Sequence, residues 1–283
     1  MLRIAIQNKG RLGEESLGLL GRIGIEIDTT KRKYLAKASN LPIEMLNLRD
    51  DDIPQVVADN VAQLGIVGLN EVEEKGYDVT VVTRLCFGHC RLSLAIPKNE
   101  EYNGLKYFRG KRIATSYPNI LNRFFKEKGI EIRTVVIAGS VEITPSAGMA
   151  DAIFDIVSSG GTLVSNGLKE VETVLESEAV LIAYPTLTDE NKRLLEEIKF
   201  RIESDSISRN KKYLLMNIPN DSLEKAIEIL PSMRSPTIIP LAADGWSSIH
   251  SVVNSSELWD KVRQLKAIGA EGILVLSVDK IIL

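Results

Sequence analysis

The chain has 283 residues, long enough for two or three domains with separate hydrophobic cores. Hydrophobic residues make up 44% and charged residues 26%, a globular composition that excludes a disordered or fibrous chain. Lys and Arg number 35 against 38 Asp and Glu, which argues against a dedicated nucleic-acid-binding protein. Charges or glycines interrupt every apolar run, so no membrane span is predicted.

Two cysteines, Cys86 and Cys90, flank His89. A tetrahedral zinc site needs a fourth ligand, and the other histidine, His250, lies far along the chain. We therefore predict a structural role for both cysteines as small buried side chains, and no metal site made by protein residues alone. The low cysteine content and the absence of a signal-peptide pattern at the start favour a reducing compartment, the cytoplasm.

Strand and helix patterns alternate along the first third of the chain. Apolar runs predict three strands, at residues 2–7, 43–48 and 64–67. Amphipathic patterns predict a helix over residues 14–23 that ends at Gly24 and another that begins after Asp52 and has Pro54 in its first turn. This alternation predicts right-handed crossovers and a mainly parallel sheet.

A polar stretch at residues 97–104 predicts a crossing into a second α/β lobe. In that lobe a helix over residues 119–128 is expected, with strands at 111–115, 133–138 and 151–157. A turn-rich segment follows at 158–167, and a strand at 180–183 returns the chain to the first lobe. Two lobes joined by crossing segments would have a cleft between them in which a ligand could be enclosed.

The pattern changes after a charged helix predicted at residues 188–206. Elements then follow in the order β-α-β-β-α-β, at residues 213–218, 222–230, 237–240, 248–253, 257–268 and 273–278. This order is that of a ferredoxin-like domain. Such small domains often bind regulatory ligands, but the fold alone does not establish that role.

The most informative segment follows the strand that ends near Asp155. It is a loop of small residues made of Ser158, Ser159, Gly160, Gly161 and Thr162. Small residues let backbone amides converge on a phosphate, and the hydroxyls add further donors. An acid just before such a loop can accept hydrogen bonds from ribose hydroxyls, so the segment resembles the PRPP-binding signature of phosphoribosyltransferases. The alternative is an ordinary glycine-rich turn beside a solvated aspartate.

The signature usually has two adjacent acids, and this chain departs from it. Phe154 stands before Asp155, which leaves one carboxylate at the end of the strand. Asp151 lies four residues earlier and is predicted to share a strand face with Asp155, because side chains alternate along a strand. Asp151 is therefore a possible helper.

Two more segments follow strand ends, where ligands of open α/β sheets gather. Lys9 and Arg11 come directly after the first strand, and two cations there suit phosphate or pyrophosphate, although such turns are also common on protein surfaces. Arg49 follows the second strand and is a ligand candidate. Asp52, three residues later, is predicted to be a helix cap.

Together these segments resemble the long form of the ATP phosphoribosyltransferase family, which catalyses the first step of histidine biosynthesis. The likeness covers essentially the whole chain. In chain order it is carried by Asn8-Lys-Gly-Arg-Leu, Arg49-Asp-Asp-Asp-Ile-Pro, Leu64-Gly-Ile-Val-Gly, Gly88-His-Cys-Arg-Leu-Ser-Leu-Ala, Gly110-Lys-Arg-Ile-Ala-Thr-Ser-Tyr-Pro, Gly139-Ser-Val-Glu, Asn166-Gly-Leu-Lys-Glu-Val-Glu and Ser235-Pro-Thr-Ile-Ile-Pro-Leu. The terminal domain separates the long form from the short form.

The resemblance implies an α/β fold with a two-lobed catalytic core like that of periplasmic binding proteins and a C-terminal ferredoxin-like (ACT-like) regulatory domain. We place the first lobe at residues 1–95 and 180–206, the second at 96–179 and the regulatory domain at 207–283. The family also implies a homo-oligomer in which dimers assemble into hexamers.

The implied reaction transfers the 5-phosphoribosyl group of PRPP to N1 of ATP, giving N1-(5-phosphoribosyl)-ATP and pyrophosphate. It requires Mg²⁺, which would be held mainly by substrate oxygens. The implied PRPP-binding residues are Asp151, Asp155, Ser158, Ser159, Gly160, Gly161 and Thr162. The implied contacts for ATP or pyrophosphate are Lys9, Arg11, Arg49 and Glu142, the last with no defined role.

The family implies that histidine binds the terminal domain as a feedback inhibitor. Carried over by motif, its contacts are Thr237 and the turn that ends at Gly272. The alternative is that Pro236 and Gly272 only shape turns.

Two other functions fit the same patterns. A two-lobed binding protein with a sensor domain would have the same fold, but no reason to pair a PRPP-type loop with the turn of Lys9 and Arg11. A phosphoribosyltransferase that uses a different base is the second alternative. Incubation with PRPP, Mg²⁺ and ATP, followed by detection of phosphoribosyl-ATP, distinguishes all three.

Overall fold

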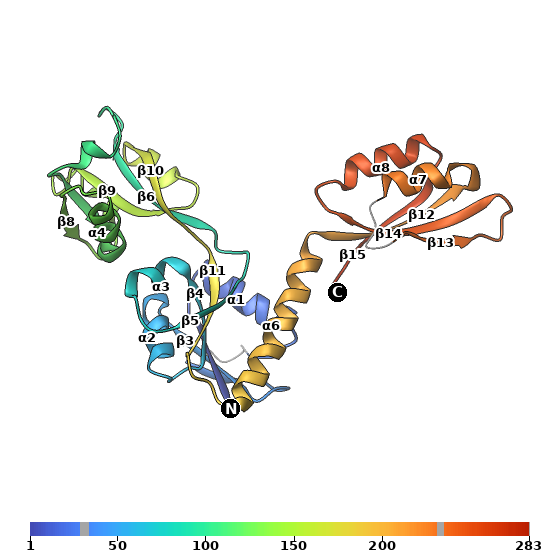
Figure 1. Cartoon of the computed structure of the whole chain (residues 1–283), viewed down its shortest axis with the longest axis horizontal. Coiled ribbons are helices and arrows are strands. Elements are labelled where there is room, and N and C mark those ends of the chain that lie inside the picture. Colours follow the sequence, from blue (N-terminus) through green and yellow to red (C-terminus); the bar gives the residue numbers. More distant parts are fainter. Residues whose placement is uncertain (29–33, 231–234, 283) are drawn as a thin grey trace. The chain divides into compact units, whose positions relative to one another are not determined.

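The computed structural model describes residues 1–28, 34–230 and 235–282. Contacts within the chain divide it into two compact units, Met1–Glu196 and Glu197–Leu283. The first unit contains two α/β lobes, each built on its own sheet, and the second is a smaller domain on a third sheet (Figure 1). The mixed α/β class predicted from the sequence is therefore confirmed.

The first lobe is a mixed sheet with helices packed on it. Its strands are β1 (Leu2–Gln7), β2 (Leu35–Lys37), β3 (Ile43–Leu48), β4 (Leu64–Gly68), β5 (Thr80–Arg84) and β11 (Ala179–Ala183). Its helices are α1 (Arg11–Arg22), α2 (Ile53–Ala58) and α3 (Leu69–Lys75). The strand order is β2-β3-β1-β4-β11-β5. β1 runs parallel to β3 and β4, so the strands predicted in the first third of the chain are parallel as expected, whereas β2 and β11 are antiparallel to their neighbours and make the whole sheet mixed.

The second lobe has the same kind of mixed sheet. Its strands are β6 (Cys90–Pro97), β7 (Arg112–Thr115), β8 (Arg133–Val136), β9 (Ala152–Val157) and β10 (Leu168–Ser177), and its helices are α4 (Pro118–Glu127) and α5 (Gly161–Ser165). The order is β10-β6-β9-β7-β8, with β7 parallel to β8 and β9, and β6 antiparallel to β9 and β10.

One strand in each sheet is contributed by chain arriving from the other lobe. β6 enters the second lobe from β5 of the first, and β11 enters the first lobe from β10 of the second. β6 lies between β9 and β10 and is antiparallel to both, and β11 lies between β4 and β5 and is antiparallel to both. This reciprocal exchange joins the two lobes into one core, the two-lobed arrangement expected from the sequence. The sequence patterns did not predict β6, and the predicted lobe boundary at residues 95 and 96 falls inside it.

An aromatic core explains how the second lobe packs. Phe108, Phe125 and Phe154 are fully buried, and the rings of Phe108 and Phe125 are 5.5 Å apart in an edge-to-face contact. α4 supplies Phe125 from its apolar face, and β9 supplies Phe154. Because side chains alternate along a strand, burial of Phe154 in this core directs Asp155 to the opposite face of the sheet.

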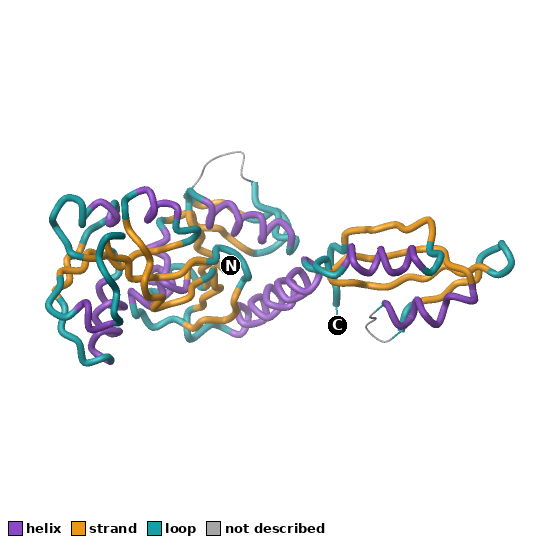
Figure 2. Tube along the Cα trace, turned by 90° about the horizontal axis from the view of Figure 1, so that it is seen from above, coloured by secondary structure: helices purple, strands orange, loops and turns teal. Residues whose placement is uncertain are grey.

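The terminal unit has the ferredoxin-like arrangement predicted from its element order. It begins within α6 (Asp189–Arg209) and contains the strands β12 (Lys211–Pro219), β13 (Thr237–Pro240), β14 (Trp246–Asn254) and β15 (Glu271–Ser277), and the helices α7 (Leu223–Ile229) and α8 (Leu258–Ala267). The sheet is antiparallel in the order β13-β14-β12-β15. Both helices lie on the same side of the sheet (Figures 1 and 2). The core between them includes Leu214, Met216, Ile249 and Leu265.

Two local expectations are corrected. Asp52 does precede α2, but among the described residues its side chain makes no capping hydrogen bond, because the chain enters the helix through a 3-10 turn over Asp50–Asp52. Cys86 is exposed and Cys90 only partly buried, so the expectation of two buried cysteines is wrong. In residues 1–28, 34–230 and 235–282, no helix is long and apolar enough to cross a membrane.

Glu74 of α3 connects the first lobe to the start of α4 in the second. Its buried carboxylate accepts hydrogen bonds from the backbone amides of Asn119 and Ile120, each at 2.9 Å. These amides belong to the first turn of α4, where the helix itself provides no acceptors. A side chain of the first lobe thus caps a helix of the second.

We expect Glu74→Ala to lower the free energy of unfolding by about 1–2 kcal/mol, because it leaves two helix-end amides without their acceptor. Glu73→Ala is the matched control, since that neighbouring carboxylate is exposed and pairs at 2.8 Å with Arg123. Exposed pairs of this kind contribute little. Urea denaturation followed by circular dichroism measures both variants, and equal losses would contradict the capping role.

Candidate active site

The predicted phosphate loop lies between β9 and α5. Ser158, Ser159 and Thr162 are exposed, and Gly160 adopts a left-handed conformation with φ of 79°. Residues with a side chain are strained at such an angle, so the turn between the strand and the helix requires glycine there. The hydroxyls and the backbone of a loop made of small residues are therefore open to solvent and to a ligand.

Asp155 lies near the end of β9 that leads into the loop, on the face opposite Phe154, and is half-buried. Burial raises the pKa of its carboxyl from 3.8 to about 6, the amide of Ile156 opposes the rise by donating to Oδ1 at 2.8 Å, and the charge of Glu142 adds to it. Carboxyl groups with a shifted pKa are common at functional sites, because binding of a ligand can require a carboxylate at a position that does not stabilise the fold.

Asp151 does not reach the loop. It precedes β9, whereas the loop follows that strand, so about 13 Å of extended chain separates Asp151 from Asp155 at roughly 3.3 Å per residue. Its carboxylate instead pairs with Arg112, accepting from Nη2 at 2.8 Å and from the backbone amide at 2.8 Å. These hydrogen bonds lower the pKa of Asp151. The structure gives Asp151 a structural partner at the far end of the strand.

The carboxyl ends of β7, β8 and β9 meet at one edge of the second sheet, because these strands are parallel. Tyr117 follows β7, Glu142 follows β8 in a 3-10 turn, and Asp155 is near the end of β9. Glu142 is thereby close enough to influence the ionisation of Asp155. Sequence reasoning found Glu142 and Asp155 but missed Tyr117.

The predicted cations come together at an edge of the first sheet. β1 and β3 pair in parallel with Gln7 opposite Leu48, and the amide of Asn8 donates to the carbonyl of Leu48 at 2.8 Å. Lys9 and Arg11 therefore follow one strand end and Arg49 the adjacent one. Lys9 is exposed, and both arginines are exposed and hydrogen-bond nearby carboxylates, Arg11 to Glu15 at 2.7 Å and Arg49 to Asp51 at 3.1 Å.

A buried polar cluster joins these two sheet edges, and no sequence pattern identified it. Tyr117 donates from its hydroxyl to Glu71 at 2.9 Å and accepts from Asn70 Nδ2 at 3.3 Å. Asn70 also pairs with Ser177 at 2.9 Å. Burial raises the pKa of both Glu71 and Tyr117. Tyr117 lies in the stretch Gly110–Pro118, so the family motif was the available signal for it.

Across residues 1–28, 34–230 and 235–282, no three His, Cys, Asp or Glu side chains are placed to hold a metal ion together. Asp155 and Glu142 nevertheless provide carboxylate oxygens on the loop side of the second lobe, and Mg²⁺ prefers such donors when phosphate oxygens complete its shell. The donor set thus fits a metal ion that arrives with a phosphorylated substrate.

The two residues proposed for the regulatory site lie on opposite edges of the terminal sheet. Thr237 begins β13 and Gly272 lies in β15, with β14 and β12 between them, a separation of roughly 14 Å at about 4.8 Å per strand. Gly272 has φ of 58°, and an added Cβ would approach Asn217 at 3.3 Å. Thr237 pairs with His250, whose Nδ1 hydrogen-bonds Tyr213 at 2.8 Å. The structure does not bring Thr237 and Gly272 together within one chain.

These observations define a two-lobed α/β protein whose strand-end carboxylates, cations and phosphate-type loop lie at the sheet edges of its core, followed by a ferredoxin-like domain. A family model described as HisG: ATP phosphoribosyltransferase matches residues 49–204, and one described as HisG, C-terminal domain, matches residues 208–280. The chain is 57% identical over 282 residues to the ATP phosphoribosyltransferase of Bacteroides thetaiotaomicron, with 100% of both chains covered. It is 49% identical over 282 residues to that of Cytophaga hutchinsonii, with 100% of this chain and 99% of the relative covered.

A solved structure also matches, the ATP phosphoribosyl transferase (HisG:HisZ) complex from Thermotoga maritima. It aligns with a TM-score of 0.61 and 29% identity over 72% of this chain and 99% of its own. The chain therefore belongs to the ATP phosphoribosyltransferase family of histidine biosynthesis, and the resemblance drawn from its motifs is confirmed.

The raised pKa of Asp155 predicts a stability that depends on pH. The carboxyl group of Asp155 binds its proton more tightly in the folded chain than in the unfolded chain. Loss of that proton therefore destabilises the fold as the pH rises from 3.8 through about 6. We expect Asp155→Asn to stabilise the protein at about pH 8 by at most about 3 kcal/mol. The gain should shrink as the pH falls toward 4. Calorimetric unfolding at both ends of this range measures it, and a gain that does not vary with pH would contradict the assignment.

Proposed function

We propose that this chain transfers the 5-phosphoribosyl group of PRPP to N1 of ATP, forming N1-(5-phosphoribosyl)-ATP and pyrophosphate. The observation that carries the proposal is the half-buried carboxylate of Asp155, followed directly by an exposed loop of hydroxyls and glycines at the edge of the second sheet. A ribose 5-phosphate group needs such a pair, because the sugar offers hydroxyl donors and the phosphate needs amide and hydroxyl donors.

Within the proposed site, Ser158 to Thr162 bind the 5-phosphate and Asp155 accepts hydrogen bonds from the ribose hydroxyls. Asp151 is left out of this set, because its carboxylate is bound to Arg112 at the other end of β9. Glu142 lies close to Asp155 and would contribute negative charge on the sugar side. Lys9, Arg11 and Arg49 are proposed for pyrophosphate or for the phosphates of ATP, since they carry exposed positive charge at adjacent strand ends.

In the proposed reaction the lone pair of adenine N1 forms a bond to C1 of the ribose, and the bond from C1 to the pyrophosphate oxygen breaks with its electrons passing to pyrophosphate. Positive charge develops on the sugar and negative charge on the leaving group. Asp155 stabilises the former and the strand-end cations the latter, so positioning and electrostatics carry the catalysis. Mg²⁺, when bound with PRPP, would neutralise part of the pyrophosphate charge.

The direct test is incubation of the full chain with PRPP, Mg²⁺ and ATP. We expect phosphoribosyl-ATP and pyrophosphate to form, and EDTA to stop the reaction. Replacing ATP with other bases tests the alternative of a different acceptor. Binding of PRPP without transfer to any base would support a binding protein and overturn the proposal.

We expect Thr162→Val to weaken PRPP binding about tenfold or more, because it removes one hydrogen bond to a charged phosphate while preserving side-chain shape, a loss of roughly 1.5–3 kcal/mol. Ser165→Ala is the matched control in the same helix, since that hydroxyl donates to the carbonyl of Gly161 at 3.0 Å. Isothermal titration with PRPP measures both. Unchanged affinity in Thr162→Val would remove this residue from the site.

We further propose that the terminal domain binds histidine as a feedback inhibitor. It is a compact unit with its own core, which supports independent folding. The unit begins at Glu197, and Asp205 near the end of α6 accepts from Lys280 at 2.9 Å. Histidine inhibits only if it binds the inhibited state more tightly than the active one. Because Thr237 and Gly272 are about 14 Å apart within one chain, we treat them as separate candidates.

We expect a fragment of residues 197–283 to bind histidine and a chain ending at Glu196 to lose inhibition by histidine. The shorter fragment 208–283 is the control for folding, because it lacks Asp205, the partner of Lys280. Calorimetry on the fragments and initial rates on the full and shortened chains measure the two effects. Inhibition by histidine that persists without the domain would refute the regulatory role.

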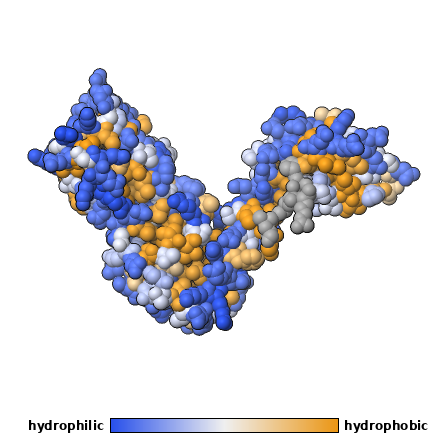
Figure 3. Space-filling model, in the orientation of Figure 1, coloured by the Kyte–Doolittle hydropathy of each residue, from blue (hydrophilic) through white to orange (hydrophobic). Residues whose placement is uncertain are grey.

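The same domain supports assembly into a homo-oligomer. β13 and β15 are the edges of its sheet and carry roughly half-exposed Ile238, Ile239, Leu274, Val275 and Leu276. Hydrophobic surface is visible beside the sheet in Figure 3. Unpaired strand edges with apolar side chains are surfaces on which chains associate. The proposed dimers and hexamers are measured by analytical ultracentrifugation with and without histidine.

A further inference from the structure

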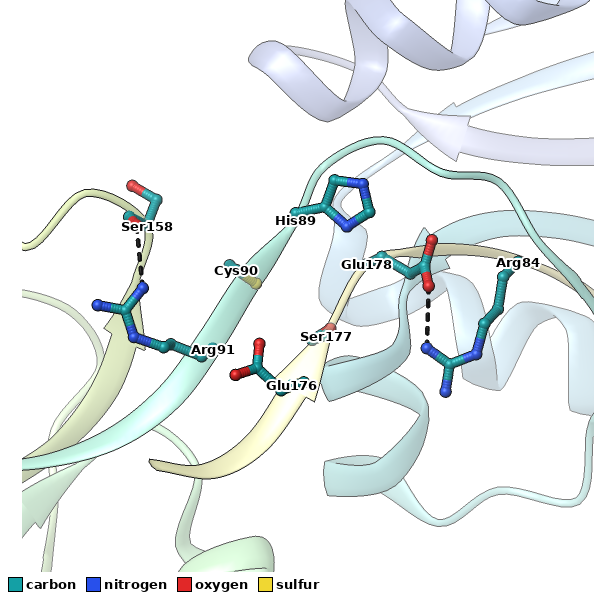
Figure 4. Close-up of a pocket in the computed structure, with 8 residues that line it drawn as sticks. All are labelled: Arg84, His89, Cys90, Arg91, Ser158, Glu176, Ser177 and Glu178. Atoms are coloured by element: carbon teal, nitrogen blue, oxygen red, sulfur yellow. Dashed lines mark hydrogen bonds and ion pairs between the residues drawn. The ribbon is translucent and has the colours of Figure 1, made fainter. Parts of the chain in front are cut away.

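The guanidinium group of Arg91 links three separate parts of the second lobe. Arg91 lies near the start of β6, and its Nε and Nη2 donate to the two carboxylate oxygens of Glu170 on β10 at 2.5 and 2.6 Å. Its remaining nitrogen, Nη1, donates to the carbonyl of Ser158 at 3.2 Å. Figure 4 shows the side chain directed at this first residue of the loop. All three nitrogens of Arg91 are therefore used.

Glu170 is held on its other side by the sheet. Ser93, which is buried, donates to Glu170 Oε1 at 2.7 Å. Ser93 also lies directly opposite Asp155 in the pairing of β6 with β9. Hydrogen bonds from Arg91 lower the pKa of Glu170, which keeps the pair charged at neutral pH. The network thus reaches the first residue of the loop and the strand neighbour of the acid proposed to bind the ribose.

The contact with Ser158 determines how the next peptide group faces. The carbonyl of one residue and the amide of the next lie in one plane and point in opposite directions across a trans peptide bond. With the carbonyl of Ser158 turned toward Arg91, the amide of Ser159 points away from the guanidinium. A small-residue loop has few side-chain contacts of its own to maintain that orientation.

We propose that Arg91, fixed by Glu170, is a positioning residue that orients the amides of the loop for the 5-phosphate of PRPP. This inference rests on the proposed function of the loop. Arg91 acts through the Ser158–Ser159 peptide and does not touch the substrate. A pocket of about 190 Å³ lies next to this contact and is lined in part by His89, Arg91, Ser158 and Glu176. Direct binding of a phosphate by Arg91 in that pocket is the competing role that the test must separate.

The same lobe contains a matched pair for comparison. Arg112 also binds a carboxylate through two nitrogens, Asp151 at 2.8 and 3.3 Å, and donates to a loop carbonyl, that of Gly148, at 3.0 Å. Both pairs are partly exposed. The difference is position, because the Arg112 pair lies at the start of β9 and the Arg91 pair near its end. The variants Arg112→Lys and Asp151→Asn therefore serve as controls, because they show the effect of losing an arginine–carboxylate pair that does not contact the loop.

The experiment compares Arg91→Lys, Glu170→Gln and their double variant with these controls in the full chain. Lysine keeps the charge but lacks the three-nitrogen geometry, and glutamine keeps the shape but removes the charge that fixes Arg91. We expect both single variants to raise the Kd and KM for PRPP by roughly tenfold to a hundredfold. The KM for ATP and the melting temperature should stay near the wild-type values. The double variant should be no worse than the worse single variant, because both changes release the same contact.

Each outcome decides the proposal. One outcome is that the wild type binds PRPP and that Thr162→Val weakens this binding, whereas Arg91→Lys and Glu170→Gln leave it unchanged. In that case the loop assignment holds and the positioning role is wrong. If Arg91→Lys weakens binding but Glu170→Gln leaves it unchanged or tightens it, Arg91 touches the substrate directly and the positioning role is also wrong. Losses matched by the Arg112 and Asp151 controls, or accompanied by a lower melting temperature, would show a merely structural pair. Failure of the wild type itself to bind PRPP refutes the proposed function instead.

Discussion

The alternation of side chains along β9 is the constraint on which the candidate site depends. Phe154 fills the aromatic core on one face, so Asp155 must face the loop side. A second acid in place of Phe154, as in the usual PRPP signature, would put an unpaired charge into that core, which is strongly unfavourable. Asp151 shares the face of Asp155 but lies at the wrong end of the strand. The sheet therefore leaves one β9 carboxylate beside the loop. The residues around that carboxylate have to provide the other contacts that the usual pair of acids would make.

That environment explains how two acids near Asp155 are tolerated. Burial is the main cause of the raised pKa of Asp155, and the negative charge of Glu142 adds to it. Glu170 is a further acid in the same network, but Arg91 and Ser93 hydrogen-bond it, so its charge is compensated within the protein. Asp155 accepts a hydrogen bond from the amide of Ile156. It does not require a cation like Arg91 if the hydroxyl groups of a substrate donate to it. An acid whose burial costs stability in the free protein is typical of a position kept for a ligand.

The sequence predicted those elements whose residues follow one simple period. Short and largely apolar runs predicted β1, β3, β4 and β11, and the order of elements predicted the ferredoxin-like sheet. It missed the crossing strand β6 and its partner β10, because Arg91, Ser93, Glu170 and Glu172 break the apolar pattern of these two strands. Three of these residues, Arg91, Ser93 and Glu170, form the network that contacts the loop. The separation of Thr237 from Gly272 follows from the strand order β13-β14-β12-β15, which the assignment of these two residues by motif did not take into account.

The contacts between the two lobes lie at the same strand ends as the candidate site. α3 begins directly after β4, and α4 begins soon after β7, so Asn70, Glu71 and Glu74 meet Tyr117 and the first turn of α4 close to the ends of both sheets. These contacts are buried hydrogen bonds, which require particular partners and distances, whereas an apolar contact would tolerate sliding. Residues proposed for the ribose 5-phosphate of PRPP lie at strand ends of the second lobe, and those proposed for pyrophosphate or the phosphates of ATP lie at strand ends of the first. A change in the polar cluster would therefore change the spacing between the two sets, which links the geometry of the lobes to the chemistry proposed between them.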